Sequence, residues 1–369
     1  MFLVKYLNDE NYIESPHMVF KKDEKLESVI IINEEVCHCC FSECTSLKSV
    51  AIISDKPIII QRHGFYQCSS LEKIIINGKL IVKDDKGQTI INNIQMNRHV
   101  ITDYSGDDLQ LIITNDRQTM VVNNLPLIIE DGKLKIKPRY HYRQLIIYNG
   151  QPVAKPPIDI HNDAFLDCSS LKYFDFQNVK FIGSSAFGDS GLESVKSRAR
   201  TIEHYAFAGC DSLQSVKLNR IKVLDESLFS NCSSLTDINI NVPPLTFINK
   251  WVFSHCSSLK NIDLGNTSIT SIRKLCFSNC YSLTNITLPN SLKRIPSSAF
   301  YRCYSLTKVV ANNIRIIEKD AFVRCDSLIN TNFPKPFALG DGNSFSEEDG
   351  EEDCRIAFVN SLMTNNEFH

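Results

Sequence analysis

Apolar residues recur at fixed intervals along most of this chain. A Phe is followed three residues later by a Cys and three further on by a Leu, and the spacing between successive Phe residues is 20 to 24 wherever the run is continuous. The Phe positions are Phe41, Phe65, Phe165, Phe187, Phe207, Phe229, Phe253, Phe277, Phe300 and Phe322. Self-similarity at such a period predicts a repeat architecture.

The stretch between Ser282 and Leu306 shows the unit most clearly. Its apolar residues are Leu283, Ile286, Leu288, Leu292, Ile295, Ala299, Phe300 and Cys303. After each Leu the residues alternate between apolar and polar, as in Leu235 to Ile240, which predicts a short strand with one buried face. One unit is too small to form a core, so we expect identical units to stack and bury their apolar residues against one another.

The cysteines follow the repeat. Nine of the ten Phe residues have the Cys, and Phe187 has Ser190 in its place, while Cys40 and Cys276 occupy a position that elsewhere holds Ala. A position shared with Ser and Ala suits a small buried group, so we interpret these cysteines as free thiols that act as small hydrophobes.

The segment Cys37-His38-Cys39-Cys40 departs from this pattern. Cys37 and Cys39 fall in outward positions next to His38, and a zinc or redox site is the alternative interpretation there. Structural zinc requires paired ligands with a second half-site, and none is evident in the sequence. We therefore expect no metal and no cofactor.

The pattern L-x-x-I-x-L-P-x-x-L-x-x-I-x-x-x-A-F-x-x-C-x-S, which Leu283 to Ser305 follow closely, resembles the BspA-type leucine-rich repeat, also called the Treponema pallidum type. The resemblance covers Leu26 to Leu71 and Ile160 to Leu328. It implies a leucine-rich repeat solenoid with a parallel β-sheet on one face and short helical turns or irregular segments on the other. Many relatives are surface adhesins that bind host or matrix proteins, but leucine-rich repeats are scaffolds with diverse partners.

The repeat divides the chain into five predicted segments. These are an N-terminal cap (1–25), leucine-rich repeats (26–76), a stretch without the Phe and Cys marks (77–158), further repeats (159–334) and a tail (335–369). Residues 77–158 keep short apolar strands separated by turn signals such as Asp131-Gly132. Degenerate repeats with hairpin excursions are the preferred interpretation, and a β-rich insertion is the alternative.

The outward positions of the predicted strands form the candidate protein-binding face. Its candidate residues are Tyr173, Asp175, Lys196, Lys217, Asp237, Asn261, Asp263 and Asn285. The columns are polar and mixed in sign, and only Tyr173 is of a type enriched at binding hot spots. A solvated sheet face and a binding face are therefore equally compatible with the pattern.

The tail carries a second candidate. Asp341 to Asp353 contain seven acids and no base, which is typical of a solvated segment. The following Arg355-Ile356-Ala357-Phe358 resembles the R/K-V/I-x-F motif through which regulatory subunits dock on type-1 protein phosphatase. That resemblance implies that Ile356 and Phe358 are anchors and that Arg355 faces acidic groups. The alternative is that this segment packs on the last repeat as a cap.

Composition narrows the function further. The chain has 40 basic and 42 acidic residues, so its net charge gives no reason to expect nucleic acid or an acidic membrane as the main partner. The chain contains no run of eighteen apolar residues, so the sequence predicts no membrane-spanning helix. Its start, MFLVKYLNDE, does not resemble a signal peptide. Nucleophile-elbow, phosphate-loop, zinc-protease and dinucleotide motifs are missing, so we expect no enzyme.

Together these features favour a cytoplasmic protein-binding scaffold, with a type-1 phosphatase regulator as its specific form. A nuclear location, or a surface adhesin exported without a signal peptide, is the alternative. The oligomeric state stays open.

Overall fold

The computed structural model describes the two repeat regions almost completely and parts of the remaining chain. The described residues are 2–4, 20–31, 35–52, 54, 57–76, 79–83, 89–91, 110–115, 118–120, 127–130, 133–136, 144–148, 157–240, 242–328, 330–331 and 338–340. The chain forms two compact units, unit 1 (Met1–Asp159) and unit 2 (Ile160–His369), which are described separately.

The repeats of unit 1 form coils. A coil contributes one strand to each of two parallel sheets. The first sheet has the order β1-β2-β4-β6, and β3 pairs in parallel with β5. In the first sheet Val29, Val50 and Ile74 are in register and buried, and β4 buries all four of its residues. The strands are β1 (Phe2–Val4), β2 (Ser28–Ile31), β3 (Glu35–Val36), β4 (Ser49–Ile52), β5 (Ile58–Ile60) and β6 (Lys73–Ile76).

The strands that follow in unit 1 pair differently. β13 runs antiparallel to β7 and parallel to β9, and β11 and β12 form the hairpin that the turn at Asp131-Gly132 predicts. This mixed pairing differs from the parallel stacking of the coils, and the boundaries of the five predicted segments stay predictions. The strands are β7 (Lys79–Lys83), β8 (Thr89–Ile91), β9 (Gln110–Asn115), β10 (Gln118–Met120), β11 (Leu127–Glu130), β12 (Lys133–Ile136) and β13 (Gln144–Tyr148).

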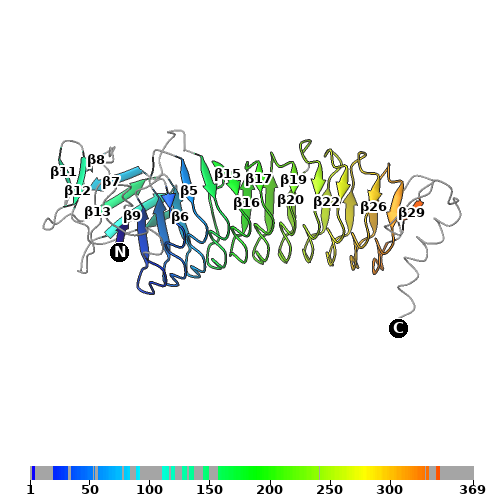
Figure 1. Cartoon of the computed structure of the whole chain (residues 1–369), viewed down its shortest axis with the longest axis horizontal. Helices are drawn as coiled ribbons and strands as arrows, with labels where there is room; N and C mark the ends of the chain where they lie inside the picture. Colours follow the sequence, from blue (N-terminus) through cyan, green and yellow to red (C-terminus); the bar gives the residue numbers. More distant parts are fainter. Residues whose placement is uncertain are drawn as a thin grey trace. The chain divides into compact units, whose positions relative to one another are not determined.

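Unit 2 repeats the coil in chain order, and Figure 1 shows its coils side by side. The strands after each Leu make a first row, paired in parallel as β16-β18-β20 and β22-β24-β26-β28. This confirms the predicted parallel sheet. The first row consists of β16 (Ser194–Ser197), β18 (Ser215–Leu218), β20 (Asp237–Asn239), β22 (Asn261–Asp263), β24 (Asn285–Thr287), β26 (Lys308–Val310) and β28 (Asn330–Thr331).

A second row of shorter strands lies just before each Phe. Its buried aliphatic residues, such as Ile202 and Ile248, stand five residues before the Phe. β14 (Ile158–Ile160) spans the division between the units. The others are β15 (Val179–Ile182), β17 (Thr201–Ile202), β19 (Val223–Leu224), β21 (Phe247–Ile248), β23 (Ser271–Ile272), β25 (Arg294–Ile295), β27 (Ile316–Glu318) and β29 (Ala338–Gly340).

The predicted helical turns are not found among the described residues; the segments that carry the Phe are turns with alternating backbone handedness. The residues two before and two after each Phe have left-handed backbones, as at Asp163 (φ 56°) and Asp167 (φ 62°) around Phe165. Between them, alternate N–H groups donate to the next coil, for example Phe165 N–H to Ala186 O at 2.8 Å. A right-handed helix bonds within itself and would leave these inter-coil hydrogen bonds unmade.

The core of each unit is a column of stacked Phe rings. In unit 2 the rings from Phe165 to Phe322 stack with centroids 5.0 to 5.8 Å apart, and every one is fully buried. In unit 1, Phe20 stacks on Phe41 at 5.4 Å and Phe41 on Phe65 at 5.3 Å. Phe20 therefore extends the column one coil before the first Phe of the predicted series.

The cysteines of the repeat are buried free thiols, as predicted, and the structure adds a role as hydrogen-bond donors. Cys210 Sγ donates to Phe187 O at 3.0 Å, and Cys303 Sγ to Phe277 O at 3.1 Å. Each such thiol adds a donor to the buried carbonyl of the Phe in the preceding coil, which can also accept a backbone N–H of its own turn, as Phe187 O does from Ser190 at 3.3 Å.

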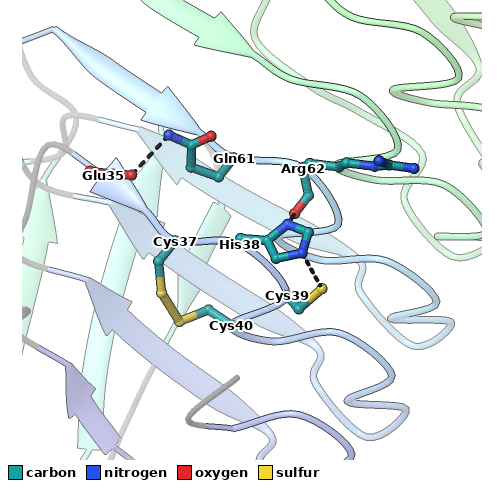
Figure 2. Close-up of a disulfide and its surroundings, with 7 residues drawn as sticks. All are labelled: Glu35, Cys37, His38, Cys39, Cys40, Gln61 and Arg62. Carbon is teal, nitrogen blue, oxygen red and sulfur yellow. Dashed lines mark hydrogen bonds between the residues drawn. A yellow bond between two sulfur atoms is a disulfide. The ribbon is translucent and has the colours of Figure 1, made fainter. Parts of the chain in front are cut away.

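The segment around Cys37 corrects two predictions. Cys40 is not a free thiol, because it forms a disulfide with Cys37 (Figure 2). Cys37 and Cys39 do not point outward; their exposed fractions are 5% and 6%. The turn folds back on itself at this point, since Cys39 takes a left-handed backbone (φ 55°).

Among the described residues no helix has the length and apolarity needed to span a membrane.

Candidate protein-binding surface

The first row of unit 2 presents its polar residues outward because its strands alternate. On β16, Val195 is buried while Ser194 and Lys196 on either side are exposed. The predicted residues Lys196, Lys217, Asp237, Asn261, Asp263 and Asn285 are all exposed on strands of this row. Their position on the surface is thus established, and their part in binding stays a prediction.

Tyr173 and Asp175 were expected on a strand, and this is wrong. Residues 171–176 form no strand, and the Asp175 carboxylate accepts a hydrogen bond from the N–H of Gln177 at 3.0 Å. Such a local bond favours a turn over an extended strand. Tyr173 is 56% exposed and offers an aromatic surface next to this turn. The predicted anchors Arg355, Ile356 and Phe358 lie outside the described residues.

Two lysines stand side by side on the first row. Lys196 of β16 is in register with Lys217 of β18, so equal charges occupy neighbouring strands. Directly paired like charges destabilise a sheet by a few tenths of a kcal/mol, on the order of the gain from an opposite pair. The pair therefore does not stabilise the sheet through its charges.

The lysine pair belongs to a larger group of bases, which we name the basic strip. It begins on the outward side of the first row and continues through the corner that leads to the second row. The backbone of Arg200 donates to Lys180 O at 3.3 Å, so these corners stack from coil to coil. The strip consists of seven exposed bases, Lys180, Lys196, Arg198, Arg200, Lys217, Arg220 and Lys222.

Two acids close to the strip in the sequence make other contacts, and Asp237 on β20 stands diagonally from Lys217 on the neighbouring strand. Glu193 pairs with Lys172 at 3.4 Å, and the Glu203 carboxylate accepts the N–H of Ser184 at 3.0 Å. Within residues 157–240 and 242–328, none of the seven bases of the strip forms an ion pair. The strip is therefore a region of concentrated positive charge on a chain whose net charge is only −2.

The outward positions further along the row behave differently. Asn285 on β24 donates through its side-chain amide to Asn261 Oδ1 on β22 at 2.9 Å, and Thr284 donates to the same oxygen at 3.3 Å. These residues satisfy one another, as expected for a solvated polar ladder.

Sequence analysis recognised Lys196 and Lys217 but not the rest of the strip. The signal was present as Lys196-x-Arg198-x-Arg200 in one repeat and Lys217-x-x-Arg220-x-Lys222 in the next. Only the strand alternation had been considered, and the corner residues between the two rows were not.

One group of described residues has the chemistry of a metal site. His38, Cys39 and His63 place one potential ligand atom each within 4.8 Å of one another. Burial raises the pKa of the Cys39 thiol, and the positive charges of Lys21 and Arg62 oppose that shift.

Comparison with known proteins agrees with this architecture. The family model described as BspA type leucine rich repeat region matches residues 14–101, 158–246 and 240–350, in six copies. Among solved structures, a leucine-rich repeat protein of T. pallidum is 27% identical, with 42% of this chain and 75% of that chain covered and a TM-score of 0.37.

Two further structures are similar over most of the chain. A leucine-rich repeat protein from Bacteroides ovatus is 18% identical, with 87% of each chain covered and a TM-score of 0.35. The pneumococcal vaccine antigen PcpA is 15% identical, with 82% of this chain and 73% of that chain covered and a TM-score of 0.32. Among curated proteins none matches. Because the family model covers more than half of its length, this chain belongs to the BspA-type leucine-rich repeat family.

Proposed function

We propose that this protein is a non-enzymatic scaffold and that unit 2 binds an acidic segment of a partner protein through the basic strip. The observation that carries the proposal is the in-register pair of Lys196 and Lys217 within a strip whose bases form no ion pair within residues 157–240 and 242–328. Charges that the fold leaves uncompensated provide attraction and orientation for a partner of opposite sign.

The arrangement of the strip suits an extended partner segment. Neighbouring strands of the first row lie about 4.8 Å apart, so the backbones of Lys196 and Lys217 are separated by about that interval. A solvated ion pair contributes about 0.2 to 1 kcal/mol. Several such contacts together amount to a moderate affinity that depends strongly on salt.

An acidic peptide tests this proposal directly. We would measure the binding of a fluorescein-labelled peptide of ten glutamates by fluorescence anisotropy, with the whole chain and with the triple variant Lys196→Gln, Lys217→Gln and Arg220→Gln. Loss of three contacts of about 0.2 to 1 kcal/mol each predicts an affinity that is lower by a factor between about 3 and about 150. The affinity of the unchanged protein should also fall as salt is raised.

The matched control neutralises three exposed bases elsewhere in unit 2, by Lys260→Gln, Lys274→Gln and Lys308→Gln. The net charge changes equally, so we expect less than a twofold loss of affinity. An equal loss in both triple variants would overturn the proposal, since only overall charge would then matter. Tighter binding of a single-stranded DNA of ten nucleotides than of the peptide would reassign the strip to nucleic acid.

The tail supports a second, separate proposal, that the chain regulates type-1 protein phosphatase. Its support is the tetrapeptide Arg355 to Phe358, whose aliphatic and aromatic residues have the spacing of the docking motif. We expect micromolar binding to the phosphatase catalytic subunit that is lost with Ile356→Ala and Phe358→Ala. The control Leu362→Ala with Phe368→Ala removes the same residue types from the same tail and should bind normally. Retained binding in the first variant would remove the tail motif from the mechanism.

A surface adhesin for a host or matrix protein is the alternative, and it differs in location. The proposed scaffold is cytoplasmic: its buried free thiols suit a reducing compartment, whereas the disulfide between Cys37 and Cys40 suits an oxidising one. Labelling intact cells with a membrane-impermeant biotin reagent separates the two. Labelling at the level of a known surface protein would favour the adhesin, and labelling only after lysis would favour the scaffold.

A further inference from the structure

The side chains of His38, Cys39 and His63 meet because of the repeat itself. Cys39 and His63 stand 24 residues apart, and each is two residues before the Phe of its own coil. Both have left-handed backbones, with φ of 55° and 56°. Equivalent positions of neighbouring coils lie about 4.8 Å apart, so the two side chains follow one another on the same side of unit 1. His38 joins them from the position just before Cys39.

The hydrogen bonds of His38 fix which of its nitrogens can bind a cation. Its Nδ1 lies 2.9 Å from the carbonyl oxygen of Arg62. A carbonyl only accepts, so Nδ1 carries the proton and Nε2 presents its lone pair. Nε2 faces Cys39 Sγ at 3.3 Å (Figure 2). Histidines that ligate metals usually donate their second nitrogen to a carbonyl or carboxylate in this way.

The separations of the ligand atoms fit a tetrahedral ion. Bond lengths of about 2.3 Å to sulfur and 2.0–2.1 Å to nitrogen place sulfur and nitrogen ligands about 3.6 Å apart around zinc. The observed separations are 3.3 Å between Cys39 Sγ and His38 Nε2 and 3.7 Å between Cys39 Sγ and His63 Nδ1. All three atoms lie within 4.8 Å of one another, so only a small closure of the two imidazoles is needed.

We propose that His38, Cys39 and His63 form a binding site for a zinc ion, with the fourth coordination position open to water or to a ligand from a partner. One thiolate and two imidazoles are ligands that select zinc over calcium and magnesium, which require oxygen ligands. On binding, the thiol proton of Cys39 leaves to solvent and the sulfur bonds to the metal.

The disulfide holds the segment that carries two of these ligands. It joins Cys37 and Cys40, which flank His38 and Cys39 (Figure 2). The short closed loop restricts the backbone of both ligands before metal arrives. The competing interpretation is a simple thiol–imidazole hydrogen bond between Cys39 and His38, which has no need of His63.

Cobalt(II) distinguishes the two interpretations, because it replaces zinc and reports its ligands by absorption. The whole chain, with the disulfide intact, would be titrated with Co²⁺ under anaerobic conditions and without reductant. We expect one Co²⁺ per chain, the intense visible bands of a tetrahedral ion and a thiolate-to-metal charge-transfer band. Added Zn²⁺ should remove both features.

Two ligand variants and two matched controls complete the test. Cys39→Ser should abolish the charge-transfer band, and His63→Asn should weaken Co²⁺ binding at least tenfold. The control His204→Asn changes a His in the same repeat position as His38, and Cys276→Ala removes a buried thiol from a position that usually holds Ala. Both controls should bind Co²⁺ as the unchanged chain does.

The His63 variant also guards against a folding artefact, because its half-buried side chain lies on a turn and its loss should leave the thermal melt of the metal-free protein unchanged. Absence of a one-to-one complex, or a charge-transfer band that survives in Cys39→Ser, would overturn the proposal. Unchanged Co²⁺ affinity in His63→Asn would leave only the thiol–imidazole pair and would also overturn it.

Discussion

Two turns of the molecule share one backbone and carry different chemistry. The turn that starts at His38 in unit 1 and the turn that starts at His204 in unit 2 have the same length, and each places its Phe three residues after the His and its Cys three residues after the Phe. In both, the thiol donates to the Phe carbonyl of the preceding coil, at 2.8 Å from Cys44 and 3.0 Å from Cys210.

The difference lies in the position two before the Phe. In unit 1 it holds Cys39 and, in the next coil, His63, which come together as a potential metal site. In unit 2 it holds Tyr205 and then Ser227, and Tyr205 instead donates to Glu226 at 3.4 Å. The inward Phe and Cys thus specify the coil, while the remaining positions are free to acquire function. Two changes in the second turn and one in the coil before it test this separation.

Removal of the inward ring should have the largest effect. Phe207 is fully buried and stacks on Phe187 and Phe229, both at 5.6 Å. Phe207→Ala leaves a cavity in a column that contacts only its neighbours, and we expect a loss of about 3 to 5 kcal/mol in the free energy of unfolding. Urea denaturation followed by circular dichroism measures this loss.

The control is an aromatic residue of the same turn. Tyr205 is 39% exposed, so Tyr205→Ala should cost less than about 1 kcal/mol. Equal losses for the two variants would show that the Phe column does not specify the coil.

Removal of the inward thiol should have an intermediate effect. Burial raises the pKa of Cys210 to about 12, so the thiol is neutral and donates its proton to Phe187 O. Cys210→Ala removes one of the two donors to that carbonyl, because the N–H of Ser190 also donates to it at 3.3 Å, so we expect a cost of about 0.5 to 1.5 kcal/mol. Cys210→Ser keeps a hydrogen-bond donor, and Ser190 naturally occupies the equivalent repeat position in the preceding coil. The urea midpoint of Cys210→Ser should therefore fall less than that of Cys210→Ala. The reverse order would mean that the thiol acts only by its size.

Sequence reasoning predicted the part of the fold that repeats. Spacing alone placed the Phe and Cys columns and the parallel strands of the first row, because inward positions must be apolar and small in every coil. It did not predict the second row, since strands of two residues such as Thr201–Ile202 are too short to show alternation. The resemblance implied helical turns or irregular segments on the other face, and spacing did not predict the alternating handedness seen there, because Asp163, Tyr205 and Trp251 share no residue type that signals a left-handed backbone.

The candidate sites were harder to predict because their residues are distant in the sequence. His63 is in the coil after Cys39, and Lys217 is in the coil after Lys196. Neither pair is visible in a search for ligands or charges at short spacing. Comparing the same position in consecutive repeats places Lys196 and Lys217 on one face, as the sequence analysis did, and also pairs Cys39 with His63, since the stacking converts one repeat length into one strand spacing.

The smallest expected effect concerns an acid beside the second turn. The carboxylate of Asp189 lies against Gly209, and a Cβ at position 209 would collide with it. Gly209 has a left-handed backbone (φ 70°). Partial burial, and the negative charges of Asp167 and Asp211, raise the pKa of Asp189 above its usual 3.8. The folded chain therefore binds this proton more tightly than the unfolded chain, and the contribution of Asp189 to stability is lost as pH rises from 3.8 through the raised folded value.

Asp189→Asn should therefore stabilise the protein at pH 7 and lose that advantage as the pH falls toward 4. The backbone is not disturbed, because Asn tolerates the left-handed conformation of this position (φ 51°). Solvent screens the exposed carboxylate, so we expect a gain below about 0.5 kcal/mol. Thermal melts at pH 7 and pH 4.5, with Asp237→Asn on β20 as the control, measure the difference. A gain that is larger at pH 4.5 than at pH 7 would contradict the proposed repulsion and would assign the effect to the shape of the turn.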